Sequence, residues 1–145
     1  MKFVAKKFEE LTTTELYEIL KSRTEIFIIE QNCFYQDLDN IDYNSLHIFY
    51  QQDNRVIAYL RAFVDESNKN VIHIGRVLTI KRKKGLGRKL MEESIKTTKD
   101  RMNGKILFME AQKHAIGFYE KFGFKIISDE FAIDGIPHIK MELEL

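Results

Sequence analysis

The order in which strand-like and helix-like segments follow one another constrains the fold most strongly. Apolar residues alternate, or run together in β-branched stretches, in seven segments typical of strands: residues 2–8, 46–51, 56–64, 71–80, 105–109, 124–127 and 136–145. They recur at helical spacing in three others: residues 13–27, 84–101 and 114–122. This β-α-β-β-β-α-β-α-β-β order predicts an α/β (α+β) fold, in which helices pack on a mainly antiparallel sheet.

Local signals mark where several of these elements begin and end. Thr12 and Glu15 have the spacing of a capping box, in which each side chain bonds the backbone N–H of the other residue. A helix is therefore expected to begin just after Thr12. The dipeptides Asp53-Asn54 and Asp134-Gly135 suit the turns of β-hairpins.

Length and cysteine content favour a simple organisation. The 145 residues suit one domain, spanning 1–145, which can bury a core without disulfides or a structural metal. The single cysteine, Cys33, cannot form an internal disulfide, and no apolar run approaches the ~18 residues of a membrane span. Lys6 and Lys7 stand where a signal peptide would need apolar residues. We therefore expect a cytoplasmic protein with no membrane partner.

The net charge of +1 is unevenly distributed along the chain. Residues 81–105 carry ten Lys or Arg and three Asp or Glu, whereas residues 1–60 carry six and ten. A basic segment in a nearly neutral chain favours local anion binding over a field that covers the whole surface. A solvated helix face is the alternative.

The sharpest local feature is the turn Arg82-Lys83-Lys84-Gly85-Leu86-Gly87, between a predicted strand and a predicted helix. Glycine lets the backbone approach a ligand closely, and the start of a helix has unpaired N–H groups and a partial positive charge. The turn, with Lys81, Arg88 and Lys89, is therefore a candidate phosphate cradle. Residues 81–89 hold six cations, so a nucleic-acid-binding patch is an alternative. The spacing fits neither a P-loop nor a dinucleotide fingerprint.

Two spaced motifs resemble those of the GNAT superfamily of N-acetyltransferases. Arg82-x-x-Gly85-x-Gly87 is similar to the family's Arg/Gln-x-x-Gly-x-Gly/Ala turn. The second motif begins at Gln112, where the family has asparagine, and reads Gln112-x-x-Ala115-x-x-Phe118-Tyr119-x-x-x-Gly123-Phe124. Further segments resemble the ElaA-like branch: residues 27–33, 74–77, 111–112 and 134–138. Together these segments cover nearly the whole chain.

The resemblance implies a sheet whose central strands splay apart and hold acyl-CoA, with acetyl-CoA as the expected cosubstrate. It implies that backbone groups of Val77, Leu78 and Thr79 align the pantetheine arm like an added strand. Gln112 would contact the pantetheine or its thioester end. Four residues, 78–81, separate Val77 from the turn, fewer than the family commonly has. The resemblance assigns the pyrophosphate to the turn, through Arg82, Lys83, Lys84, Gly85, Leu86, Gly87 and Arg88.

The implied reaction is direct transfer of an acyl group from the thioester to a primary amine of a small molecule or peptide. Such an amine has a pKa near ~10.4, so the neutral nucleophile costs about 4.6 kcal/mol at pH 7, which a base or a water chain must supply. Tyr119 matches the family tyrosine near the CoA sulfur and is the candidate acid. The alternative is a core aromatic beside Phe118 and Phe122.

Glu30 is the candidate base, because it follows the apolar run 27–29, where partial loss of water would raise its pKa. The alternative is a cap or an ion pair, and a water chain without a side-chain base is a further possibility. His47 and His138 lie in strand-like segments and are candidates for substrate contact, or else structural histidines. The histidines and the cysteine show no metal-ligand spacing, so no metal is expected, and Cys33 has no histidine partner nearby in the sequence.

Two arginines, Arg61 and Arg76, interrupt apolar strands, which is costly unless each is paired or faces a cleft. They either bind a substrate carboxylate or pair with acids of the predicted loop. Those acids are Asp37, Asp39 and Asp42.

Two other functions remain compatible with the sequence. A nucleic-acid-binding protein would use residues 81–89 as its footprint, although the rest of the chain is net acidic. A GNAT-fold module could also bind acyl-CoA without turnover. The acidic first third of the chain favours a cationic acceptor, and the oligomeric state is left open between monomer and homodimer.

Overall fold

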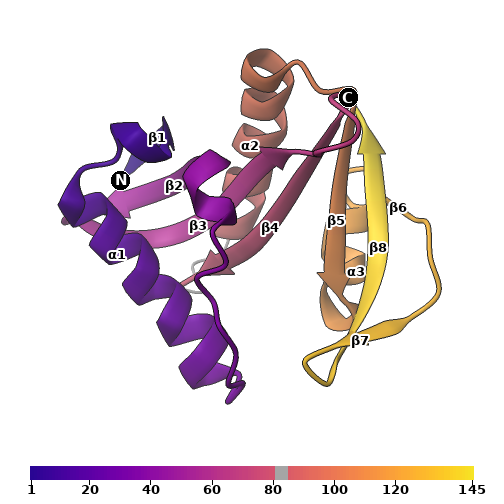
Figure 1. Cartoon of the computed structure of the whole chain (residues 1–145), viewed down its shortest axis with the longest axis horizontal. Helices are drawn as coiled ribbons and strands as arrows, with labels where there is room; N and C mark the ends of the chain where they lie inside the picture. Colours follow the sequence, from indigo (N-terminus) through magenta and orange to yellow (C-terminus); the bar gives the residue numbers. More distant parts are fainter. Residues whose placement is uncertain (81–84) are drawn as a thin grey trace.

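The computed structural model describes residues 1–80 and 85–145, which form one sheet of eight strands (Figure 1). The strand order is β1-β2-β3-β4-β5-β8-β6, and β7 pairs with β8. Of the described strand pairs, β4 with β5 is parallel and the rest are antiparallel. This confirms the predicted fold class. The strands are β1 (Lys2–Lys7), β2 (Leu46–Gln52), β3 (Arg55–Val64), β4 (Val71–Thr79), β5 (Ile106–Gln112), β6 (Lys125–Ile126), β7 (Phe131–Ile133) and β8 (Ile136–Glu144).

The first helix begins where the sequence predicts. Glu15 N–H donates to Thr12 Oγ1 at 3.0 Å, and Thr12 N–H donates to Glu15 Oε1 at 2.8 Å, which completes the capping box. Within residues 1–80 and 85–145, no helix has both the length and the apolar character that crossing a membrane requires. The helical segments are α1 (Thr13–Arg23), α2 (Leu86–Met102), α3 (Ile116–Glu120), the π-helical η2 (Thr24–Glu30) and the 3₁₀ turns η1 (Phe8–Glu10), η3 (Ile41–Asn44) and η4 (Lys113–Ala115).

Different helices cover the two faces of the sheet (Figure 1). On one face, α1 and η2 bury Ile19, Ile26 and Phe27 against Phe49 and Tyr59 of the central strands. On the other face, α2 and α3 close a larger core. Its buried residues include Ile48, Leu60, Ile72, Leu86, Leu90, Met91, Leu107, Tyr119 and Met141.

β4 and β5 separate after a short parallel pairing. Residues 71–73 of β4 pair with residues 106–108 of β5, and the described residues beyond them form no further pair between these strands. Figure 1 shows the two halves of the sheet diverging from this point. The second half of β4 therefore has an open backbone edge, and the splayed central strands that the resemblance implies are present. We call the space between the diverging strands the gap.

Several element boundaries differ from those that the sequence pattern predicts. The predicted helix 13–27 changes from α to π geometry at Thr24, and the predicted strand 105–109 extends to Gln112. The pattern does not predict β7, whose three residues pair with β8. Short strands of this kind depend on tertiary pairing and carry little periodic signal, because two or three residues cannot establish a period.

Gly104 allows a sharp test of how tightly this fold is packed. A Cβ at Gly104 would overlap Cγ1 of Ile72, which is fully buried and cannot move aside. We expect Gly104→Ala to lower the free energy of unfolding by about 1–3 kcal/mol, measured by urea denaturation, because it overpacks the core. The matched control is Gly117→Ala in α3, where a Cβ meets nothing within 4 Å. The control should leave stability unchanged or raise it by up to about 1 kcal/mol, since alanine is the better helix former. Equal unfolding midpoints for wild type and Gly104→Ala would contradict the packing described here.

Candidate active site

Two hydrogen bonds show how β4 is bonded to β3. At one end Asp65 N–H donates to Val71 O at 2.9 Å, and at the other Ile80 N–H donates to Ile57 O at 2.7 Å. In an antiparallel pair every second residue bonds its partner, and the residues between them point N–H and C=O to the opposite side. The backbone groups on the open edge of β4 can therefore be identified by counting inward from each end.

A bulge shifts this alternation halfway along β4. The register of the pair slips by one residue between Tyr59 and Arg61 of β3. Beyond the slip, Leu78 lies opposite Tyr59 and bonds to β3, so the backbone groups of Val77 and Thr79 face the gap. The backbone of Leu78 does not face the gap, and its side chain is buried on the α1 side of the sheet.

α2 begins beside this edge without a capping side chain. Its N-cap, Gly85, has a φ of +86°, a left-handed conformation that glycine adopts without strain. Lys89 N–H bonds Gly85 O at 3.0 Å, so the amides of Leu86, Gly87 and Arg88 are the first-turn donors without an intrahelical acceptor. Free donors at the positive end of a helix dipole favour an anion. The other predicted phosphate ligands, Arg82, Lys83 and Lys84, lie outside the described residues.

The structure brings the two sequence motifs into contact. A Cβ at Gly87 would lie 3.5 Å from Phe118 Cζ and 3.9 Å from Thr79 Cγ2. The first turn of α2, the end of β4 and the helix α3 therefore meet within van der Waals distance. A Cβ at position 87 would make ordinary van der Waals contact with Phe118, so the junction is closely packed.

Tyr119 lies in α3 with 7% of its surface exposed. Its ring makes edge contacts with Phe118 and Phe124 at centroid distances of 5.3 and 6.0 Å. Burial raises the pKa of Tyr119 to about 12, so its hydroxyl is protonated at neutral pH. Within the described part of the chain, its hydroxyl makes no hydrogen bond, which leaves it available to a ligand.

The segment after η2 reaches across to the C-terminal half of the sheet. Gln112, the last residue of β5, donates from Nε2 to Gln31 Oε1 at 3.4 Å. Cys33 Sγ contacts Asp134 O in the β7–β8 turn at 4.0 Å. Glu30 adjoins Gln31 but is exposed, so the predicted partial desolvation of Glu30 is wrong. The π-helix ends at this residue and turns its side chain toward solvent rather than into the apolar core.

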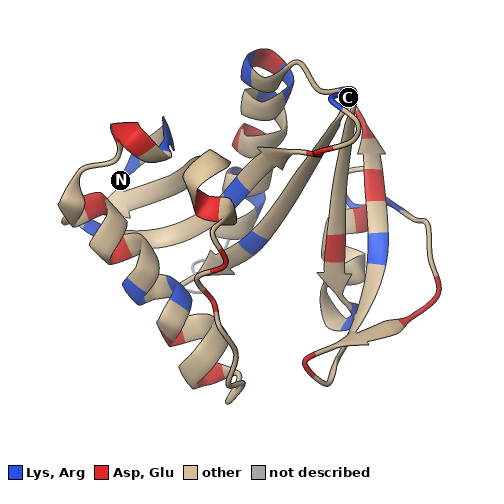
Figure 2. Cartoon of the chain, in the orientation of Figure 1, with Lys and Arg blue, Asp and Glu red and all other residues tan. Residues whose placement is uncertain are grey.

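A network of three arginines and three aspartates lies on the α1 side of β3 and β4. Figure 2 shows acidic positions along the connection between η2 and β2, next to basic positions on β3 and β4. Arg23 is fully buried, and its Nε and Nη1 bond Asp37 Oδ2 at 2.9 Å and Asp42 Oδ1 at 2.6 Å. Arg61 bonds Asp39 Oδ2 at 2.6 Å and Asp42 Oδ1 at 3.0 Å.

The predicted substrate arginines therefore have protein partners. Arg76 Nε donates to Asp37 Oδ1 at 2.7 Å, which completes the network. Burial by itself would raise the pKa of Asp39 and Asp42, but hydrogen bonds and charge from the arginines outweigh it and lower both. The carboxylates are thus ionised at neutral pH, and the geometry matches the structural-pair interpretation of Arg61 and Arg76.

Sequence reasoning missed Arg23, which joins α1 to this network. It occupies the last turn of a helix, where a basic residue usually favours the helix dipole and faces solvent. A signal was present, because Arg23 follows the buried Ile19 by four residues and precedes Ile26 by three, on one apolar stripe. A charged residue on an apolar stripe requires a buried partner.

The two candidate histidines have different surroundings. His47 is fully buried, with Nδ1 at 2.8 Å from Tyr59 Oη and Nε2 at 2.9 Å from Asp42 O. Since a backbone carbonyl only accepts, Nε2 carries the proton and Nδ1 accepts from the tyrosine. His138 lies opposite Gln112 in the β5–β8 ladder, with Nδ1 at 2.7 Å from Ile136 O. His138 therefore lies beside the end of β5, whereas His47 is enclosed by the network.

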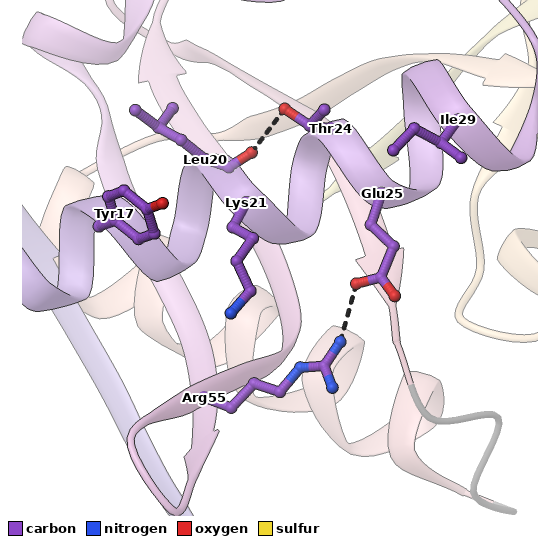
Figure 3. Close-up of a pocket in the computed structure, with 7 residues that line it drawn as sticks. All are labelled: Tyr17, Leu20, Lys21, Thr24, Glu25, Ile29 and Arg55. Carbon is purple, nitrogen blue, oxygen red and sulfur yellow. Dashed lines mark hydrogen bonds and ion pairs between the residues drawn. The ribbon is translucent and has the colours of Figure 1, made fainter.

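A separate hollow of about 570 Å³ lies on the outer side of α1 and η2 (Figure 3). The polar contact across it is an ion pair between Arg55 and Glu25 at 2.8 Å. None of the predicted site residues lines it, and no convergent set of catalytic groups forms there. The lining residues are Tyr17, Leu20, Lys21, Thr24, Glu25, Ile29 and Arg55.

Comparisons with known proteins agree with this geometry. The family model of the acetyltransferase (GNAT) domain matches residues 11–145. A UPF0039 protein of Schizosaccharomyces pombe is 38% identical over 149 residues, covering 100% of this chain and 98% of that protein. Protein ElaA of Escherichia coli is 34% identical over 140 residues, covering 94% of this chain and 92% of ElaA.

Solved structures give the same result. The crystal structure of Escherichia coli ElaA matches with a TM-score of 0.90 at 31% identity, covering 97% of both chains. That of an acyl-CoA N-acyltransferase from Pseudomonas aeruginosa matches with a TM-score of 0.89 at 32% identity, covering 98% of this chain and 99% of that one. The chain therefore belongs to the GNAT acyltransferase family, in its ElaA-like branch.

The enclosed histidine leads to a prediction for stability against pH. Burial lowers the pKa of His47, outweighing the opposite effect of Asp42, so the unfolded chain takes up this proton first. As the pH falls below about 6.5, the free energy of unfolding should decrease by up to about 1.4 kcal/mol per pH unit, until the lowered folded pKa is reached. Urea denaturation of wild type and His47→Gln between pH 7 and 5 measures this slope. The variant should lack this contribution to the slope. Parallel curves of unfolding free energy against pH for wild type and variant would show that His47 is not held neutral.

Proposed function

We propose that this protein is an acyl-CoA-dependent N-acyltransferase that transfers acetyl from acetyl-CoA to a primary amine of a small molecule or peptide. The observation that carries the proposal is the open edge of β4 beside the uncapped N-terminus of α2, in a chain of the GNAT family. The proposal takes residues 1–145 as one catalytic domain that acts as a monomer or homodimer. The proposal also includes a cytoplasmic location. A chain with a single cysteine forms no internal disulfide, so it does not require an oxidising compartment.

The described residues fit an extended ligand that carries both amides and phosphates. Val77 and Thr79 offer backbone donors and acceptors at a strand edge, which suits amide groups arranged like an added strand. The first-turn amides of α2, at Leu86, Gly87 and Arg88, suit a phosphate. An apolar partner would leave all these backbone groups unsatisfied at a substantial cost in free energy. We assign Gln112, at the end of β5, to the far end of such a ligand.

Acyl-CoA, when bound, supplies a thioester whose acyl group passes to the amine, with the CoA thiolate as leaving group. Tyr119 has a pKa of about 12, whereas a thiol has a pKa near ~8.5. Full proton transfer from Tyr119 to a thiolate would then cost about 4.8 kcal/mol. The role that the structure favours for Tyr119 is a hydrogen bond that stabilises charge on sulfur.

The number of protons that must be released depends on whether the acceptor amine is neutral or protonated. A neutral amine carries the proton that the departing thiolate needs, whereas an ammonium must first release one more proton. Glu30 is exposed and adjoins Gln31, which bonds Gln112 at the end of β5; we assign Glu30 as the acceptor of that proton, and water reaching this position is the alternative. His47 takes no part in the proposal, because both of its ring nitrogens are already bonded.

The cofactor site can be tested by thermal shift. Acetyl-CoA at 100 times its dissociation constant should stabilise the protein by about 2.7 kcal/mol, which is a rise of several degrees in Tm. Gly85→Glu should abolish the rise, because its carboxylate repels phosphate at the N-terminus of α2. The control Gly85→Ala imposes the same left-handed strain without the charge and should retain most of the rise.

The outcomes separate the competing functions. No rise for wild type with acetyl-CoA or CoA, together with a salt-sensitive rise with an RNA or DNA duplex, would replace the acyltransferase by a nucleic-acid-binding protein. Equal loss in both Gly85 variants would attribute the effect to backbone strain rather than to phosphate binding. A rise without turnover of any amine would favour a module that binds acyl-CoA without catalysis.

Tyr119→Phe tests the proposed contact with sulfur. Loss of a hydrogen bond to a charged group costs about 1.5–3 kcal/mol, so kcat should fall roughly 10- to 150-fold. The dissociation constant for acetyl-CoA should change less than about threefold, since the hydroxyl acts mainly when charge develops. The matched control is Tyr50→Phe, a buried tyrosine of β2 on the same face of the sheet. An unchanged kcat in Tyr119→Phe would return Tyr119 to the role of a core aromatic.

A further inference from the structure

Arg76 has an unusual backbone conformation for its residue type. Seven non-glycine residues of the described chain have a positive φ, and six of these are Asn or Asp. Those two types adopt the left-handed region at low cost, because their short side chains bond locally. Arg76 is the seventh, with a φ of +52°, and it lies within β4 rather than in a turn. A residue held in this region persists only when its surroundings enforce it.

The conformation of Arg76 has a direct consequence for the open edge of β4. Residues 76 and 77 together form the bulge that separates the two registers of the β3–β4 pair. Without the bulge, every second residue of β4 would bond to β3 along the whole strand, and Val77 and Thr79 would be among those residues. Arg76 and Leu78 would then face the gap instead. The bulge therefore decides which amides a ligand meets.

The side chain of Arg76 is held from several directions by one loop. Its Nε donates to Asp37 Oδ1 at 2.7 Å, and its Nη2 donates to Asp37 O at 3.0 Å and to Asp39 Oδ2 at 3.4 Å. Its guanidinium also lies over the ring of Tyr35, at 5.5 Å from the centroid. Contacts to a carboxylate and to the backbone of the same residue resist both rotation and withdrawal of the side chain.

Asp37 is itself anchored. Its second carboxylate oxygen accepts from Arg23 Nε at 2.9 Å, and its backbone oxygen accepts from Arg23 Nη2 at 3.1 Å. Arg23 is fully buried between α1 and the sheet, so Asp37 can move only if α1 moves with it. The loop thus provides a rigid support for Arg76.

We propose that Asp37 and Arg76 are positioning residues, which lock the β4 bulge so that Val77 and Thr79 present their backbone groups to acyl-CoA. This proposal rests on the proposed function, since it takes acyl-CoA as the ligand of the open edge. The role of Arg76 is to hold a backbone conformation, and its guanidinium does not contact the acceptor. The distinction can be tested because glycine adopts a positive φ without a side chain to hold it.

The experiment compares Arg76→Ala with Arg76→Gly. Isothermal titration calorimetry with CoA gives the dissociation constant, and steady-state kinetics with acetyl-CoA give KM and kcat. Arg76→Ala removes the bonds to Asp37 and Asp39, and alanine disfavours the left-handed conformation. The dissociation constant and the acetyl-CoA KM should therefore rise about tenfold. Arg76→Gly removes the same bonds, but glycine adopts that conformation freely. Both values should therefore rise only about threefold. At saturating acetyl-CoA, kcat should stay within about twofold of wild type in both variants.

Arg55→Ala is the matched control, because it also removes an arginine from a carboxylate ion pair, on the far side of α1. It should leave the dissociation constant and both kinetic values unchanged. Asp37→Asn gives a second measurement, which should weaken CoA binding as Arg76→Ala does while leaving the sequence of β4 intact. If Asp37→Asn does not fold, because Arg23 loses a buried partner, the Arg76 series alone decides.

Each outcome has one interpretation. Equal CoA affinity in wild type, alanine and glycine variants would overturn the lock while leaving the acyltransferase proposal intact. Unchanged CoA affinity with an acceptor KM raised equally in both Arg76 variants would assign the guanidinium to acceptor binding and overturn the positioning role. Failure of wild type to bind CoA would overturn both proposals.

Discussion

The burial of Arg23 is the interaction on which the N-terminal half of the structure depends. A guanidinium without solvent is tolerated only if it is paired and its donors are satisfied. Its Nε and Nη1 meet Asp37 and Asp42 carboxylates, and its Nη2 meets a backbone carbonyl. Because Arg23 belongs to α1 and the acids belong to the connection that follows η2, this pairing determines where the connection crosses the sheet. Once the connection is in place, its acids meet Arg61 of β3 and Arg76 of β4.

The gap depends on this arrangement and on the early end of pairing between β4 and β5. A strand edge inside a protein carries donors and acceptors that must be satisfied by protein, water or ligand. Here the edge adjoins the first turn of α2, where the amides of Leu86, Gly87 and Arg88 have no acceptor within the helix. The surface that we propose for the acyl donor is thus made mostly of backbone. At the end of β5, side chains of the segment after η2 reach Gln112 and the β7–β8 turn, and such segments can differ between proteins of one fold. Family membership accordingly defines the donor more closely than the amine.

The sequence features on the proposed donor side are local ones. Gly85 and Gly87 lie at the start of α2 as expected, and the structure brings Gly87 and Phe118 together. The backbone of Leu78, however, bonds to β3 and does not face the gap. The candidates for catalysis and for contact with the acceptor were harder to interpret. Glu30 follows an apolar run yet is exposed, since the π-helix ends there. His47 lies in a strand, which fits substrate contact and a structural role alike, and its partner Tyr59 lies 12 residues away on the neighbouring strand.

The sequence by itself determined the features that involve residues within a few positions of each other. These are the capped start of α1, the glycine-led start of α2, and the order of the strands and helices apart from β7. Only the tertiary structure decided which arginines are buried, which carboxylates they meet and which amides of β4 face the gap. Arg76 and Asp37 are 39 residues apart, and no periodicity or local propensity links them. Their pairing exists because the sheet and α1 bring both near a third, buried charge, and that proximity is a property of the folded chain alone.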